Sequence, residues 1–167
     1  MELTIAVINH YGVEILIVKL ICRAKPGVRE LKFKYKIKMN LEGRKIIVNK
    51  SSKELTELLK SPENYKDFMP DGLQKFETRD NGFKFGLQGM PEIALKIDEV
   101  DDQKAVLRSA SSSLDFSLTA TLNPISENQT EVQMLFEGKF NPFIKMMVEK
   151  PLQNFINTLT DKIEAYK

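Results

Sequence analysis

Cysteine is nearly absent from this sequence, with Cys22 as its single example among 167 residues. One cysteine cannot form an intrachain disulfide, and chains without disulfides are the rule in reducing compartments. A chain of this length can bury enough surface to build a core without such cross-links. The cysteine count therefore favours a cytoplasmic location and a fold held together by packing.

Histidine and tryptophan are scarce as well, since the chain has one histidine, His10, and no tryptophan. From Met39 onward there is neither histidine nor cysteine. The side chains that most often act as a near-neutral general base or bind zinc are thus missing from that part. Gly86-Leu87-Gln88-Gly89 matches neither the P-loop nor the dinucleotide fingerprint. We therefore expect no metal site and no cofactor.

Two polar stretches remain as candidates for chemistry. A serine nucleophile within residues 109–113 would need an activating base, and none is evident. The acidic residues within 98–102 lack the ligand spacing and the closing glutamate of an EF-hand. A polar loop and a solvated hairpin are the simpler interpretations of these stretches.

Long apolar runs are also lacking, since none reaches the about 18 residues that span a bilayer. The apolar stretch near the start is interrupted by Glu14 and Lys19 and has no basic region before it, unlike a signal peptide. The net charge of +2 gives no argument for nucleic acid. We expect no transmembrane segment and no nucleic-acid partner, while a transient contact with a membrane stays open.

The sequence changes character near Met39. Residues 1–38 carry eight Lys/Arg against three Asp/Glu, a net charge of +5, whereas the remainder carries −3. We predict that residues 1–38 are an N-terminal extension outside the natural domain, and that residues 39–167 form the domain. The alternative is a functional basic arm or an additional strand, because residues 31–38 alternate apolar and basic side chains.

Beyond Met39 the pattern is regular and begins with a strand and two short helices. Residues 44–49 are rich in β-branched side chains and predict the strand. Ser51 or Ser52 can cap a helix over Ser52–Lys60, where leucines recur at helical spacing. Pro62 favours the start of another helical turn, which we expect to reach Phe68.

Six segments of alternating apolar and polar residues come next. The Asn81-Gly82 pair between the first two segments is a strong hairpin signal. Clean alternation of this kind predicts an antiparallel sheet with one buried and one wet face. The predicted strands cover residues 73–78, 83–88, 93–98, 104–109, 114–122 and 131–140.

The chain ends in a long amphipathic segment. Asn141 can cap a helix, and Pro142 would occupy its first position, where a missing N–H costs nothing. Apolar residues then recur at steps of three and four as far as Tyr166. Pro151 predicts a kink or break near Lys150. Such a helix needs an apolar surface to lie on, and the buried face of the sheet is the candidate.

Four stretches resemble a known superfamily: IIVNKS at residues 46–51, SPENYKDFMP at 61–70, GFKF at 82–85 and GKFNP at 138–142. They resemble the START-like, helix-grip proteins, among them the polyketide cyclase and dehydrase-like proteins and the major birch-pollen allergen. The resemblance covers about residues 43–166. It implies an α+β fold in which a curved antiparallel sheet of about seven strands wraps around a long C-terminal helix, with two short helices after the first strand.

That fold implies a cavity between the concave face of the sheet and the C-terminal helix. Alternation on the strands and helical spacing would place apolar side chains on both of its walls. Flexible methionines suit an adaptable apolar pocket, although plain core packing explains the same pattern. The predicted cavity-lining residues are Phe85, Leu95, Phe116, Leu118, Met134, Phe136, Phe143, Met147, Leu152, Phe155 and Leu159.

The resemblance is specific for fold and weak for function, because the superfamily contains carriers, receptors, cyclases and chaperone activators. The first hypothesis is non-enzymatic binding or transport of a small hydrophobic ligand, such as a lipid, quinone or polyketide-like molecule, by a monomer or weak homodimer. The second is a cyclase or dehydratase type of enzyme using Asp115, Glu137 or Tyr65, although the first two fall on the polar side of their strands. The third is a protein-interaction accessory module, which a large exposed apolar patch would favour.

Overall fold

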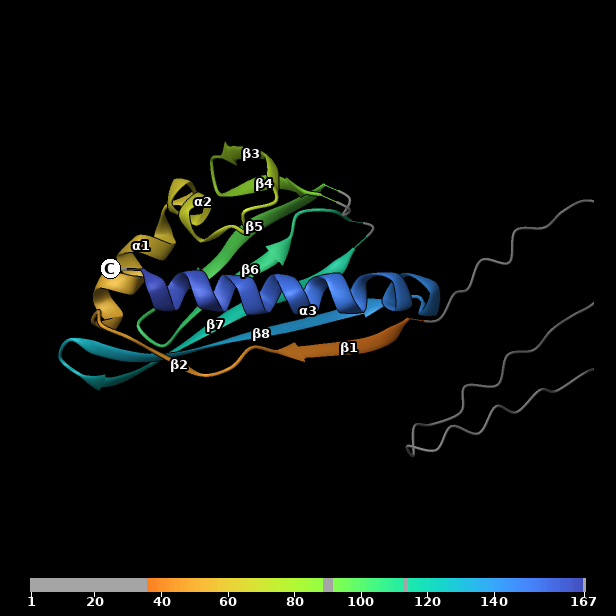
Figure 1. Cartoon of the computed structure of the whole chain (residues 1–167). Helices are drawn as coiled ribbons and strands as arrows, with labels where there is room; N and C mark the ends of the chain where they lie inside the picture. Colours follow the sequence, from red (N-terminus) through yellow and green to blue (C-terminus); the bar gives the residue numbers. More distant parts are fainter. Residues whose placement is uncertain (1–35, 89–91, 113, 167) are drawn as a thin grey trace, which may run out of the picture. The chain divides into compact units, whose positions relative to one another are not determined.

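The computed structural model describes residues 36–88, 92–112 and 114–166. Within them, one antiparallel sheet in the order β1-β8-β7-β6-β5-β4-β3 is crossed by a long helix (Figure 1). This confirms the predicted α+β helix-grip architecture. The strands are β1 (Ile37–Glu42), β2 (Ile46–Val48), β3 (Leu73–Arg79), β4 (Gly82–Leu87), β5 (Ile93–Val100), β6 (Lys104–Ser109), β7 (Asp115–Ser126) and β8 (Gln129–Phe140). The helices are α1 (Ser52–Lys60), the 3-10 turn η1 (Pro62–Asn64), α2 (Tyr65–Phe68) and α3 (Pro142–Ala165).

The first strand of the sheet has two parts: β2 lies within the strand predicted at residues 44–49, whereas β1 overlaps the alternative of an additional strand over residues 31–38 only at Ile37 and Lys38. β1 pairs with the end of β8, from Ile37 opposite Phe140 onward, and β2 pairs with the start of β8. Between them the N–H of Gly43 donates to the carbonyl of Met134 at 2.8 Å. A side chain at Gly43 would lie 2.9 Å from Thr160 Oγ1, so the chain passes close beneath α3 here. The prediction that residues 1–38 are an extension falls mostly outside the described residues, although Ile37 and Lys38 belong to β1.

Side-chain caps fix where two of the helices begin. Ser51, rather than Ser52, caps α1: its hydroxyl accepts from the N–H of Glu54 at 3.3 Å, and the Glu54 carboxylate accepts from the N–H of Ser51 at 2.9 Å. This reciprocal pair is a capping box. Asn141 caps α3 as predicted, by accepting from the N–H of Ile144 at 2.8 Å.

The C-terminal helix runs without interruption from Pro142 to Ala165, so of the kink or break predicted near Lys150 the break does not occur. Pro151 removes one backbone hydrogen bond from the helix interior. The packing of the following turns against the sheet offsets that loss, because Leu152 and Ile156 are buried. The ring of Phe155 stacks on Phe85 of β4, with 5.6 Å between ring centres.

Candidate ligand-binding site

A cavity lies under the C-terminal half of α3, between the short helices and strands β6, β7 and β8. About 40 Å³ of it is open to the centre of a water-sized sphere. One water needs about 10–15 Å³ on that measure, so the cavity is a real void in the core. Its lining consists of Leu55, Leu58, Leu59, Tyr65, Phe68, Ala105, Leu107, Leu118, Ala120, Leu122, Val132, Met134, Leu159 and Ile163.

Tyr65 contributes the one hydroxyl among these lining side chains, and that hydroxyl is already used. It donates to the carbonyl of Leu59 at 2.7 Å, while the ring stacks on Phe83 with 4.8 Å between ring centres. Burial raises the pKa of the Tyr65 hydroxyl, so the phenol stays protonated at neutral pH. The cavity wall is therefore apolar, and a void of this kind stays dry.

Two alanines explain why there is space at this point of the sheet. Ala105 of β6 and Ala120 of β7 are direct cross-strand partners, and both side chains are buried. Neighbouring positions on the same face carry leucine, at Leu107, Leu118 and Leu122. Each alanine lacks three carbon atoms that a leucine would place in the void, so the Ala105–Ala120 pair forms a low floor beneath α1 and α3.

The predicted lining residues divide into three groups. Leu118, Met134 and Leu159 line the cavity. Phe143 and Met147 lie on the surface instead, with 63% and 59% of their side chains exposed. Six are packed inside the protein away from this cavity, five of them fully buried and Phe116 half-buried: Phe85, Leu95, Phe116, Phe136, Leu152 and Phe155.

The cavity is therefore displaced from the place that the sequence analysis favoured. The predicted lining reached back along α3 to Phe143, whereas the α3 residues on the observed wall, Leu159 and Ile163, belong to the C-terminal half of the helix. The missed wall is α1, with Leu55, Leu58 and Leu59. Leucines at these spacings share one helical face, so the sequence held a signal that this short helix covers something apolar.

Leu58 separates the enclosed cavity from an open hollow on the outer side of α1. It lines both spaces, and the outer one is otherwise bordered by Lys50, Lys53, Glu54 and Glu57. The carboxylates of that hollow are engaged, since Glu54 belongs to the capping box and Glu57 lies 2.7 Å from the ammonium of Lys60. Displacement of the Leu58 side chain would therefore connect the two spaces.

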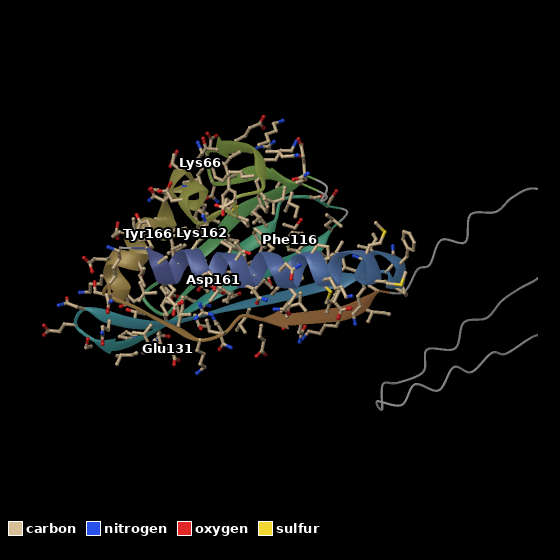
Figure 2. All side chains as sticks on the ribbon, viewed as in Figure 1. Lys66, Phe116, Glu131, Asp161, Lys162 and Tyr166 are labelled. Atoms are coloured by element: carbon tan, nitrogen blue, oxygen red, sulfur yellow. The ribbon has the colours of Figure 1, made fainter. Side chains whose placement is uncertain are left out.

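Side chains at the C-terminal end of α3, of which Figure 2 labels Asp161, Lys162 and Tyr166, tie this end of the helix to its surroundings. Asp161 accepts from the guanidinium of Arg44 at 2.8 Å, and Lys162 donates to Asp71 at 2.6 Å. The Tyr166 ring meets Phe68 edge-on, with 5.0 Å between ring centres. These contacts fix one wall of the cavity. The other helical wall, the nine-residue α1, is held by the hydroxyl of Thr56, which donates to the carbonyl of Asp101 at 3.1 Å.

The acidic candidates for catalysis lie away from the cavity. Asp115 is exposed, and exposed Glu137 lies 3.1 Å from the ammonium of Lys38. Of the three acid–base candidates only Tyr65 reaches the cavity wall.

The acids near the β5–β6 turn have structural partners. The Arg108 guanidinium lies 2.6 Å from Asp98 and lowers the pKa of that carboxyl. Asp101 accepts from the N–H groups of Gln103 and Lys104, which lowers its pKa too. In the described part of the chain, no three His, Cys, Asp or Glu side chains are grouped so that they could hold a metal ion. Nor does any helix there have the length and apolar character to span a membrane.

Comparison with known proteins identifies the fold. No family model matches the sequence, and no curated protein matches it. Norcoclaurine synthase from Thalictrum flavum matches with a TM-score of 0.59 and 15% identity, over 78% of this chain and 94% of that one. The XoxI protein from Bacillus cereus matches with a TM-score of 0.56 and 9% identity, over 76% and 94% of the two chains.

A Rhizobium loti protein matches with a TM-score of 0.56 and 19% identity, over 78% of this chain and 97% of its own. At such identities the likeness is one of fold. The chain has the helix-grip fold of the START-like proteins, the fold of the major birch-pollen allergen, as its sequence resemblance predicted.

Proposed function

We propose that this protein binds a small apolar molecule, without converting it, in the cavity between α1, the Ala105–Ala120 floor and the C-terminal half of α3. The observation that carries the proposal is the wall of that cavity, which is apolar apart from one hydroxyl that already donates to a carbonyl. Small-ligand sites are concave and mostly apolar, with few polar groups. Ligands of this description include lipids, quinones and polyketide-like molecules.

The size of the cavity sets a condition on binding. The present void of about 40 Å³ receives only a small apolar group, whereas sites for drug-sized ligands enclose about 300–1,000 Å³. A longer chain or a ring system requires α1 to move outward, which would join the cavity to the hollow beyond Leu58. Each methylene that enters contributes about 0.8 kcal/mol, so a ten-carbon chain gains about 8 kcal/mol before the costs of association. Micromolar affinity corresponds to about 8 kcal/mol after those costs, so it requires a ligand with more apolar surface than a ten-carbon chain.

The fold is compatible with an enzyme as well, since a structure of norcoclaurine synthase contains dopamine and hydroxybenzaldehyde. That complex shows that two aromatic molecules occupy a protein of this fold. A cyclase or dehydratase here would need an acid or base at the cavity wall. Tyr65 is the one candidate there, and its bonded hydroxyl with a raised pKa is a poor base near neutral pH. The geometry thus favours a carrier or sensor, which we place in the cytoplasm as a monomer or weak homodimer.

The test is a fluorescence titration with N-phenyl-1-naphthylamine, an uncharged apolar dye. Wild type should bind it saturably with micromolar affinity. Ala120→Leu, which adds three carbons inside the cavity, should weaken binding at least tenfold. Ala110→Leu adds the same atoms at an exposed position and should bind like wild type. Ala120→Val provides a milder filling should the leucine variant unfold.

Two results would contradict the proposal. In the first, wild type shows no saturable binding below about 1 mM, a concentration that corresponds to a binding free energy of only about 4 kcal/mol. The void would then be a packing defect. Equal affinity in wild type and in folded Ala120→Leu would place the bound dye somewhere else. Circular dichroism and the unfolding midpoint of each variant establish that it is folded.

A further inference from the structure

The first two turns of α3 are apolar on both of their faces. Ile144 and Val148 are half-buried against the core. On the opposite side Phe143, Met146 and Met147 form an outer stripe, with 63%, 72% and 59% of their side chains exposed. Positions three and four residues apart share one helical face, so the three side chains are contiguous. Phe143 and Met147 were predicted to line the cavity, because their spacing matches an inward face equally well.

An exposed stripe of this kind is unusual for a helix on a protein surface. A surface helix normally turns polar residues outward, and a helix that is apolar all round is normally covered. The helix begins at the end of the domain where β1 starts and β8 ends, far from α1 and α2 (Figure 1). Ile37, 37% exposed, lies opposite Phe140 in the sheet at that end and adds to the apolar surface. Among the described residues, no ring contact or ion pair involves the outer stripe.

Lysines lie near the outer stripe, along the helix and at the adjoining strand ends. Lys145 belongs to the first two turns of α3 and Lys150 to the next turn, Lys139 is the next-to-last residue of β8, and Lys36 precedes β1. None of these four lysines forms an ion pair with a carboxylate among the described residues. Two acids lie nearby: Glu149 on α3, and Asp115 opposite Lys139 in the sheet. The charge around the stripe is therefore positive on balance, which complements an anionic surface.

We propose that the outer stripe docks the protein on a lipid surface that contains anionic headgroups. Apolar side chains on one helical face beside lysines are typical of helices that lie in the membrane interface. A protein partner fits less well, because a standard protein interface uses about 20–30 residues a side. Docking of this kind rests on the surface of α3 and does not depend on a ligand in the cavity.

Tryptophan fluorescence gives a direct test, since the sequence has no tryptophan. In the full chain, Met146→Trp places a single reporter on the outer stripe. Its emission should shift to shorter wavelength with vesicles of 70% phosphatidylcholine and 30% phosphatidylglycerol, and much less with pure phosphatidylcholine. Ile125→Trp puts the reporter at a similarly exposed position on β7, where 53% of the side chain is exposed, and its emission should not change.

Flotation with the same vesicles measures the contribution of each part. The triple variant Phe143→Ser, Met146→Ser, Met147→Ser should lose at least tenfold in vesicle affinity. A matched variant, Ile47→Ser with Ile125→Ser, removes exposed apolar side chains elsewhere and should bind like wild type. Lys145→Gln with Lys150→Gln should weaken binding to anionic vesicles by about thirtyfold, since each lysine near such a surface contributes about 1 kcal/mol. All of these positions are on the surface, so folding should be unaffected.

Three outcomes would overturn the proposal. The first is an unchanged Met146→Trp emission with anionic vesicles. The second is equal flotation of the triple variant and wild type, which would place lipid binding elsewhere in the chain. The third is a concentration-dependent dimer in sedimentation velocity that the triple variant abolishes, because a second copy would then cover the stripe. None of these results bears on the dye titration, so failure of docking and failure of the cavity proposal are distinguishable.

Discussion

Filling the cavity with one larger side chain is expected to stabilise the protein. The void of about 40 Å³ costs about 1 kcal/mol at about 24 cal/mol per Å³ of cavity. Ala120→Val places two more carbons on its floor and removes most of that cost. The free energy of unfolding should therefore rise by about 1 kcal/mol, and the melting temperature by about 3–5 °C for a domain of this size.

Urea unfolding and calorimetry of Ala120→Val measure this effect, with exposed Ala110→Val as the control that should change little. Leu118→Ala enlarges the same cavity and should destabilise by about 2–5 kcal/mol. The reasoning is refuted if Ala120→Val destabilises by 1 kcal/mol or more. Such a loss is what added methyl groups cause in a core that is already full.

Further predictions concern the helices, the stability at acidic pH and the start of the chain. Ser51→Ala removes the cap of α1 and should lower the free energy of unfolding by about 1 kcal/mol in urea; no change would mean that the capping box does not form. Hydrogen bonds from Ser51 to the Glu54 carboxylate lower the pKa of that group below 4.5. The contribution of ionised Glu54 to the free energy of unfolding is therefore present above pH 4.5 and is lost as the pH falls through the pKa of the folded state. Urea midpoints of wild type and Glu54→Gln should accordingly converge at acidic pH, and a constant difference would contradict this. Pro151→Ala restores a backbone hydrogen bond inside α3 and should stabilise by about 1–3 kcal/mol in the same assay, whereas destabilisation would show that the helix needs its proline. A chain without residues 1–35 should melt within a few degrees of the full chain, and a larger drop would assign that segment a structural role.

The sheet and the long helix could be predicted because their patterns are local. Alternation and caps depend on neighbours in sequence, so β6 was predicted with its observed bounds and Asn141 as the cap of α3. The same alternation indicates β1, since Ile37, Met39 and Leu41 alternate with polar residues. The change of net charge near Met39 obscured that continuity, although charge on the wet face of a strand says little about pairing.

The cavity could not be predicted, because it depends on contacts between distant residues. Ala105 and Ala120 create space only because the register places them opposite each other, and alternation alone does not fix a register. The orientation of α3 was ambiguous for a similar reason. Its first turns carry one apolar stripe with Phe143 and Met147 and another with Ile144 and Val148, and spacing cannot decide which stripe faces the sheet.

Native mass spectrometry of the protein purified from its own host tests the central claim most directly. If the cavity is a binding site, a fraction of wild type should carry one apolar molecule per chain, which a solvent extract then identifies. The adduct should be depleted in Ala120→Leu and retained in Met146→Ser, because only the first substitution fills the cavity. Two results would contradict the account. In the first, wild type carries no adduct and also fails to bind N-phenyl-1-naphthylamine. In the second, Ala120→Leu carries the adduct to the same extent as wild type.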